Sequence, residues 1–471
     1  MLFNSTVFLK FLAAFLLAHF AVRNRRGLRN LLIIGASYLF YGWWDVRFLG
    51  LLFFSSLLDF GIGLSLQKDR SRRMRRFLLT LSVGGNLGVL GFFKYFDFFS
   101  ESLVDLLGVM GIGATLPGLQ VVLPVGISFY TFQTMSYTID VYRGRIQPTR
   151  SLVEFLAYVS FFPQLVAGPI ERAERLLPQF ARTLVITAAR IEEGLWLCVW
   201  GLFKKVVLAD NLAPLVEMVY SGDTPSGPMV CLGTVAFAFQ IYCDFSGYSD
   251  IARGVAQLLG FHLMVNFNIP YGALNIREFW RRWHISLSTW LRDYLYVSLG
   301  GNRKGTGRMA LNLMVTMVLG GLWHGAAWNY VLWGVWHGLG LVFYRFWSDS
   351  RTSGDRTSFR FVRGAAAWIL TMSFVGYGWL LFRAESLGQV MALTRALVDF
   401  SVPEWLGGFC VNLAVFSAPL ILMQLWQART GNLLAPMAIA RWRRSVLMAG
   451  LVVGILFSWE KEQVPFLYFQ F

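Results

Sequence analysis

Two of the five histidines in this 471-residue sequence, His284 and His324, lie in contrasting surroundings. His284 is flanked by arginines and tryptophans, whereas small and apolar residues surround His324. A neutral imidazole in an apolar setting can accept a proton from a hydroxyl group, which is the task of the base in acyl transfer. From the spacing alone, a histidine that only packs between helices explains the pattern around His324 better. The sequence therefore offers a chemical role without deciding for it.

The segment around His284 combines aromatic and basic side chains. Read as one helix, residues 276–296 form an amphipathic element at the membrane interface, with rings at headgroup depth and arginines toward phosphates. Either this element anchors the chain in lipid, or it is a wall that binds an anionic acyl donor, with His284 aiding the reaction. Under the second interpretation, the candidate donor-binding residues beside the two histidines are Arg281, Arg282, Trp283, Trp323 and Asn329.

Carboxylates within apolar segments are further candidates for functional residues. An ionised group costs about 2.5–3.5 kcal/mol or more at the centre of a bilayer, so it is rarely placed there without a role. Asp140, Asp244 and Asp250 lie in such segments. A salt link to Arg253 or another nearby arginine would make Asp244 and Asp250 structural, which we favour. Asp244 also stays a candidate donor-binding residue.

Other catalytic patterns are missing from the sequence. No phosphate-binding loop, GxSxG, GxGxxG or HExxH pattern occurs in the structural context that it requires. The four cysteines lack the spacing of metal ligands. His324 and His337 would point to well-separated faces of one helix, so we expect no metal site. His19, His262 and His337 are interpreted as structural.

The composition is that of a membrane protein. Hydrophobic residues make up 56% of the chain and charged residues 14%, against about 25% charged in soluble domains. At roughly 20 residues per helical crossing, this content allows at most about thirteen crossings. The net charge of +16 comes from basic clusters between apolar runs. That pattern keeps loops on the cytoplasmic side, and we expect no nucleic-acid partner.

The apolar runs predict one all-α membrane domain over residues 1–471. The N-terminal run lacks a basic leader and a small-residue cleavage site, so we expect a retained first crossing. Proline and glycine interrupt residues 123–133 and 161–170, which are either broken helices around a cavity or surface loops. The expected crossings lie near residues 1–20, 30–44, 47–66, 77–96, 121–139, 151–168, 191–208, 228–247, 365–383, 406–426 and 444–459.

Seven segments together resemble the membrane-bound O-acyltransferase family, in particular its bacterial branch of alginate O-acetyltransferase-like proteins. They keep the family's order, and the core that carries them spans about residues 120–345. The segments are LPVGISFYTFQ (123–133), YTIDVYRG (137–144), FPQLVAGPI (162–170), DFSGYSD (244–250), NFNIPY (266–271), FWRRWHISLSTWLRDYLY (279–296) and GLWHG (321–325).

The resemblance implies a multi-pass enzyme of the bacterial inner membrane, with about 11–13 transmembrane or re-entrant helices around a catalytic tunnel. The family's invariant histidine corresponds to His324, and its second histidine to His284. Acetyl-CoA or another acyl thioester, on CoA or a carrier protein, is the implied cytoplasmic donor, with no bound cofactor or metal. The implied acceptor is an exported polysaccharide such as alginate, and a periplasmic acetyltransferase is the implied partner.

Three alternatives remain open at this stage. A polytopic transporter or flippase would depend on Asp140, Asp244 or Asp250 more than on His324. A family member that acylates lipid or protein would need a deep apolar slot for a long chain. A scaffold of a secretion complex would be insensitive to substitution of either histidine.

Overall fold

The structure of the chain is a computed structural model. The structure describes residues 1–66, 70–113, 115–116, 118–119, 121–166, 168–222, 225–349, 360–459 and 466–467. Within these residues every regular element is an α-helix or a short 3₁₀- or π-helix. The prediction of an all-α, polytopic membrane protein is therefore confirmed. By length and composition, five described helical stretches could cross a membrane: Val46–Ser65, Arg72–Val109, Gly227–Leu258, Val362–Arg383 and Leu406–Thr430.

The chain forms two compact units. The first comprises Met1–Leu195 and Ala252–Met264, and the second comprises Trp196–Ile251 and Val265–Phe471. Helices α10 (Ala188–Leu202) and α12 (Gly227–Leu258) each contribute residues to both. The expectation of a single domain over residues 1–471 stays a prediction.

In the first unit, α6 (Ile127–Tyr142) packs against α3 (Leu49–Ser65) and α4 (Arg72–Leu90). Asp59 of α3 is buried there and accepts hydrogen bonds from Ser82, Asn86 and Thr138. A buried carboxylate needs such donors, so this network holds the three helices in register. The unit's other helices are α1 (Thr6–Val22), α2 (Arg26–Gly42), α5 (Phe96–Val109), α7 (Leu152–Ser160), α8 (Phe162–Leu165) and α9 (Ala173–Phe180).

In the second of the two interrupted segments, residues 161–165 are buried within this unit. Phe161 and Phe162 are fully buried, and Phe162 packs edge-on against Phe11 and Phe15 of α1. Ser37 of α2 accepts a hydrogen bond from the Phe162 N–H at 3.1 Å. Of the two interpretations of this stretch, the structure therefore supports irregular backbone enclosed by protein, where its polar groups find partners.

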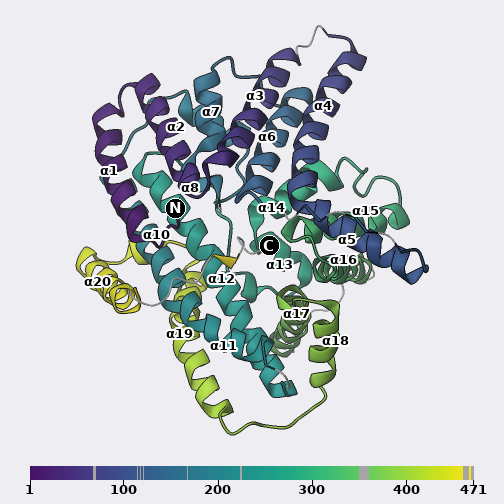
Figure 1. Cartoon of the computed structure of the whole chain (residues 1–471). Coiled ribbons are helices and arrows are strands. Elements are labelled where there is room, and N and C mark those ends of the chain that lie inside the picture. The colour runs from purple at the N-terminus through teal and green to yellow at the C-terminus, as the bar shows by residue number, and fades with distance from the viewer. Residues whose placement is uncertain are drawn as a thin grey trace. The chain divides into compact units, whose positions relative to one another are not determined.

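In the second unit, α15 (Thr306–His324) and α16 (Trp328–Asp349) form an antiparallel hairpin and lie side by side (Figure 1). Small residues allow this approach. A Cβ on Gly321 would overlap the Tyr330 carbonyl oxygen and lie 3.3 Å from Gly334 Cα. The unit's other helices are α11 (Asp210–Tyr220), α13 (Ile276–Arg282), α14 (Ile285–Trp290), α17 (Arg360–Arg383), α18 (Leu387–Ala396), α19 (Leu406–Thr430) and α20 (Arg441–Ser458).

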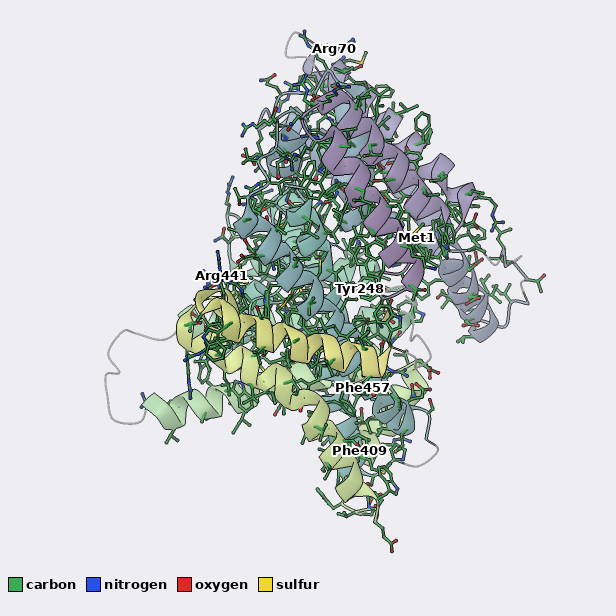
Figure 2. The ribbon with its side chains drawn as sticks, turned by 90° about the vertical axis from the view of Figure 1, so that its left-hand side faces the viewer. Met1, Arg70, Tyr248, Phe409, Arg441 and Phe457 are labelled. Atoms are coloured by element: carbon green, nitrogen blue, oxygen red, sulfur yellow. The ribbon has the colours of Figure 1, made fainter. Side chains whose placement is uncertain are left out.

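Helix α20 has a wide apolar surface. Figure 2 shows it from Arg441 to Phe457. Trp442, Val446 and Phe457 are exposed, whereas Leu451 and Ile455 are buried where α20 packs against the π-helix η3 (Phe203–Ala209). Lipid is the natural environment for such exposed apolar side chains in a multi-pass membrane protein.

The buried carboxylate of Glu171 provides a test of the packing within the first unit. Its carboxylate accepts a hydrogen bond from the Met264 N–H, and burial raises the pKa of Glu171 from 4.5 to about 7. The folded state thus binds this proton more tightly than the unfolded state does, and the free energy of unfolding falls as pH rises from about 4.5 to 7. Glu171→Gln keeps an acceptor oxygen and should stabilise the protein above pH 7, by about 3 kcal/mol at 1.36 kcal/mol per pKa unit.

Thermal unfolding in detergent micelles at pH 4.5 and pH 8 measures this effect. Glu174→Gln removes the same charge from an exposed position on α9 and is the matched control, with no gain expected. An equal gain for Glu171→Gln at both pH values would contradict the assignment.

Candidate active site

His324 is the last residue of α15 and is 4% exposed. Trp323, Trp333 and Phe382 place their rings edge-on to its imidazole, with centroids 5.0, 5.2 and 5.3 Å away. The His284 ring lies 6.5 Å from it, centroid to centroid. The structure thus brings together the two histidines that the sequence singled out, within one unit.

A cavity of about 310 Å³ reaches His324. Its residues on α15 are Met309, Leu313, Thr316, Met317, Gly320 and His324. Apart from Thr316, they follow one another at intervals of three or four residues and so share one face of the helix. At 1.5 Å per residue, this face is about 22 Å long. The cavity is therefore elongated and follows α15.

The two ends of the cavity differ in chemistry. Because α16 runs antiparallel to α15, Trp333 lines the cavity near His324, whereas Tyr344, Arg345 and Ser348 line it near Met309. Arg277 and Arg292 also line the wall. An imidazole and aromatic rings thus stand at one end, and a guanidinium group at the other.

His284 interrupts the helix that the sequence predicted over residues 276–296. α13 ends at Arg282 and α14 begins at Ile285, with His284 in the left-handed region at φ 41°. The prediction of one continuous helix is wrong, because the carbonyl of Arg282 and the N–H of Ile285 bond to Asn268 and Asn266 instead. The His284 side chain is fully buried against Phe245, at 4.7 Å between centroids, and is not among the cavity-lining residues.

The remaining sequence candidates on this side lie behind or beside the cavity. Trp283 is buried against Phe279 and Trp379, and Trp323 contacts both catalytic candidates. Arg281 is exposed, and Arg282 forms an ion pair with Glu278. None of these four lines the cavity, and their assignment as donor-binding residues stays a prediction.

Asn329 and Asp244 have partners within the protein. The Asn329 side-chain amide donates to the Ala384 carbonyl at 2.7 Å, just after the end of α17. Asp244 forms an ion pair with Lys205 at 2.8 Å and accepts from the Leu467 N–H at 2.8 Å. Neither residue lines the cavity, so the structure gives both a clear packing role, and donor binding by them stays a prediction.

The ion pairs of the intramembrane carboxylates use lysines in the second unit. Lys204 and Lys205, both on η3, pair with Asp250 at 2.7 Å and with Asp244. Pairing of either carboxylate with Arg253 or another nearby arginine stays a prediction. In the first unit, Asp140 pairs with Arg145 at 3.4 Å.

Several cavity residues escaped the sequence-based selection. Arg277, Trp280, Arg292, Trp333 and Arg345 line the cavity. Arg277, Trp280 and Arg292 carry a signal in the aromatic and basic pattern of their segment, but Arg345 carries none that sets it apart. Among the described residues, no group of three or more His, Cys, Asp or Glu side chains is placed to hold a metal ion.

Comparison with known proteins agrees with this architecture. The model of the membrane-bound O-acyltransferase family matches residues 145–382, which include both histidines and α12 to α17. This chain is a membrane-bound O-acyltransferase. It is therefore an enzyme of the membrane that transfers an acyl group to oxygen, and the resemblance seen in the sequence is confirmed.

Relatives of this acyltransferase differ in the polymer that their names give. A probable alginate O-acetylase of Azotobacter vinelandii is 43% identical over 408 residues, covering 86% of this chain and 79% of the relative. A peptidoglycan O-acetyltransferase of Helicobacter pylori is 32% identical over 523 residues, covering 100% and 98%. A teichoic acid D-alanyltransferase of Streptococcus thermophilus is 31% identical over 241 residues, covering 47% and 57%.

The close contact of α15 and α16 can be tested at Gly321. Gly321→Ala should force the helices apart, at about 1–3 kcal/mol for an overpacked core. It should lower acyl transfer at least tenfold, because His324 is on the displaced helix.

Gly307→Ala on the same helix is the control, since nothing lies within 4 Å of a Cβ there, and it should leave both properties unchanged. Thermal unfolding and acyl transfer per amount of protein measure them. Full activity in Gly321→Ala would show that the close contact between α15 and α16 does not position His324.

Proposed function

We propose that this enzyme takes a short acyl group, acetyl, from a cytoplasmic phosphopantetheine thioester and passes it across the membrane for O-acetylation of an exported polysaccharide. The observation that carries the proposal is the elongated cavity, with His324 at one end and Arg345 at the other. Guanidinium groups bind phosphate well. A phosphopantetheine arm has a phosphate at one end and the thioester at the other, so it matches this arrangement.

The reaction requires only groups that the site supplies. His324 takes the proton from the acceptor hydroxyl while its oxygen attacks the thioester carbonyl. The new C–O bond forms, the C–S bond breaks, and the thiolate leaves with the proton that His324 had taken. General base catalysis of this kind contributes about 10²–10⁴ in rate, and alignment of the reactants supplies more.

The surroundings of His324 favour a small acyl group. The Trp333 ring lines the cavity with its centroid 5.2 Å from the imidazole, so a long chain has little room beside the base. The names of the relatives that cover most of this chain also give acetyl as the group transferred. Acylation of a lipid or protein with a long chain is correspondingly less well supported.

The donor and acceptor sides follow from chemistry. Acyl thioesters of CoA and of carrier proteins are cytoplasmic, so a bacterial enzyme that uses one would reside in the inner membrane. The relatives are named for alginate and peptidoglycan, which supports an exported polysaccharide acceptor. We propose that a periplasmic acetyltransferase completes delivery to that polymer.

His324→Ala should abolish O-acetylation while leaving a folded, membrane-inserted protein. Base-labile acetate on surface polysaccharide, measured in cells with the intact gene, without it and with the variant at equal expression, reports the effect. His262→Ala is the control because that side chain is exposed. Normal acetylation in cells that carry His324→Ala would contradict the proposed function.

Arg277 tests the donor cavity separately from the base. Arg277→Glu should raise the KM for acetyl-CoA about tenfold or more in membrane vesicles, because it replaces a cation with an anion on the cavity wall. Arg25→Glu makes the same change at an exposed position in the first unit and should not alter KM. Equal KM values for the two variants would argue against donor binding in this cavity.

A further inference from the structure

The His284 side chain is held by a residue that no catalytic pattern pointed to. Asn266 is 1% exposed and precedes the helices of the site in the chain. Its Oδ1 lies 3.1 Å from His284 Nδ1, 3.2 Å from the Ser286 backbone nitrogen and 2.9 Å from Ser286 Oγ. One amide oxygen thus faces three groups around the imidazole.

These contacts fix the orientation of the Asn266 amide. The backbone N–H of Ser286 can only donate, so the atom that faces it must be the oxygen. If the amide were turned over, its NH₂ group would meet another donor. In the observed orientation the amide nitrogen donates to Ser249 Oγ at 3.2 Å, which satisfies both ends of the side chain.

The same logic fixes the tautomer of His284. An amide oxygen can only accept, so His284 Nδ1 must carry a proton and donate to it. Burial lowers the pKa of His284 to about 3, so the ring is neutral at ordinary pH. A neutral ring with a proton on Nδ1 has its lone pair on Nε2.

The backbone adds a second, independent observation. His284 has φ 41°, a strained conformation for a residue with a side chain. Two backbone hydrogen bonds flank it, from Asn268 N–H to the Arg282 carbonyl and from Ile285 N–H to the Asn266 carbonyl, both 2.9 Å. The segment that begins at Asn266 therefore offsets the strain with backbone hydrogen bonds on either side of the histidine.

We propose that Asn266 is a positioning residue, which holds His284 as the Nδ1-protonated tautomer and so makes Nε2 the basic nitrogen of the second histidine. This inference rests on the proposed function, in which His284 assists His324. Simple packing of His284 would not require the Asn266 oxygen as an acceptor for Nδ1, a strained backbone at His284, and Ser249 as a buried partner for the Asn266 amide nitrogen. We expect removal of Asn266 to lower activity about 10–100-fold, by analogy with the partners that orient metal-ligating histidines.

Nitrogen-15 NMR of the full chain, labelled at histidine, reads the tautomer directly. Subtracting the spectrum of His284→Gln assigns the His284 signals among the five histidines. We expect a protonated Nδ1 and an unprotonated Nε2 in the wild type, and a mixture of tautomers in Asn266→Ala. A proton on Nε2 in the wild type, or an unchanged spectrum in Asn266→Ala, would overturn the inference.

Activity supplies the second readout. Asn266→Ala should lower acetylation 10–100-fold and have no further effect in a His284→Ala background, whereas a purely structural role would give additive losses. Asn266→Asp keeps the acceptor oxygen and should restore part of the activity. Its carboxylate should also raise the pKa of the imidazole and shift the acid limb of the rate profile to higher pH.

Asn86→Ala is the matched control, since Asn86 is a buried asparagine that bonds to Asp59 in the other unit. It should lower stability without moving the pH profile. Full activity in His324→Ala would remove the proposed function, whatever the activity of His284→Ala. Loss of activity in those variants, with Asn266→Ala fully active, would remove only the role of Asn266.

Discussion

The site depends on one constraint, which is that every backbone polar group around the broken helix must find a partner inside the protein. Lipid offers none. The interruption at His284 leaves the Arg282 carbonyl and the Ile285 N–H outside a helix, and the segment Asn266–Asn268 bonds to both. The break can therefore be kept, and it is the break that turns the imidazole inward, beside Phe245 and His324.

The same constraint explains the buried charges of the second unit. Lys204 and Lys205 are 2% and 1% exposed, and each has a carboxylate within 2.8 Å. Removing one partner of such a pair leaves an uncompensated buried charge, which is far more costly than the pair itself. The neighbouring Lys204 and Lys205 of η3 reach different carboxylates of α12, and these ion pairs join the two elements.

The sequence predicted the helices well because runs of apolar residues have the length of a bilayer. α3, α12 and α17 lie close to the expected spans. It also singled out His324 and His284. The cavity wall could not be predicted as well, because the break at His284 and the π-helix Leu291–Tyr296 reset the helical phase. A helical wheel drawn through residues 276–296 therefore misjudges which arginines share a face. The contact between Asn266 and His284 depends on tertiary structure, and no local sequence pattern predicts it.

The unequal ends of the cavity have a consequence for inhibitor design. A competitive inhibitor would lie along the cavity, with an anionic head near Arg345 and a compact, uncharged tip beside Trp333 and His324. Shortening the linker would sacrifice one anchor or the other, so potency should peak at a single spacer length. A bulky tip would be excluded by the rings, which offers a route to compounds that spare enzymes accommodating long fatty chains.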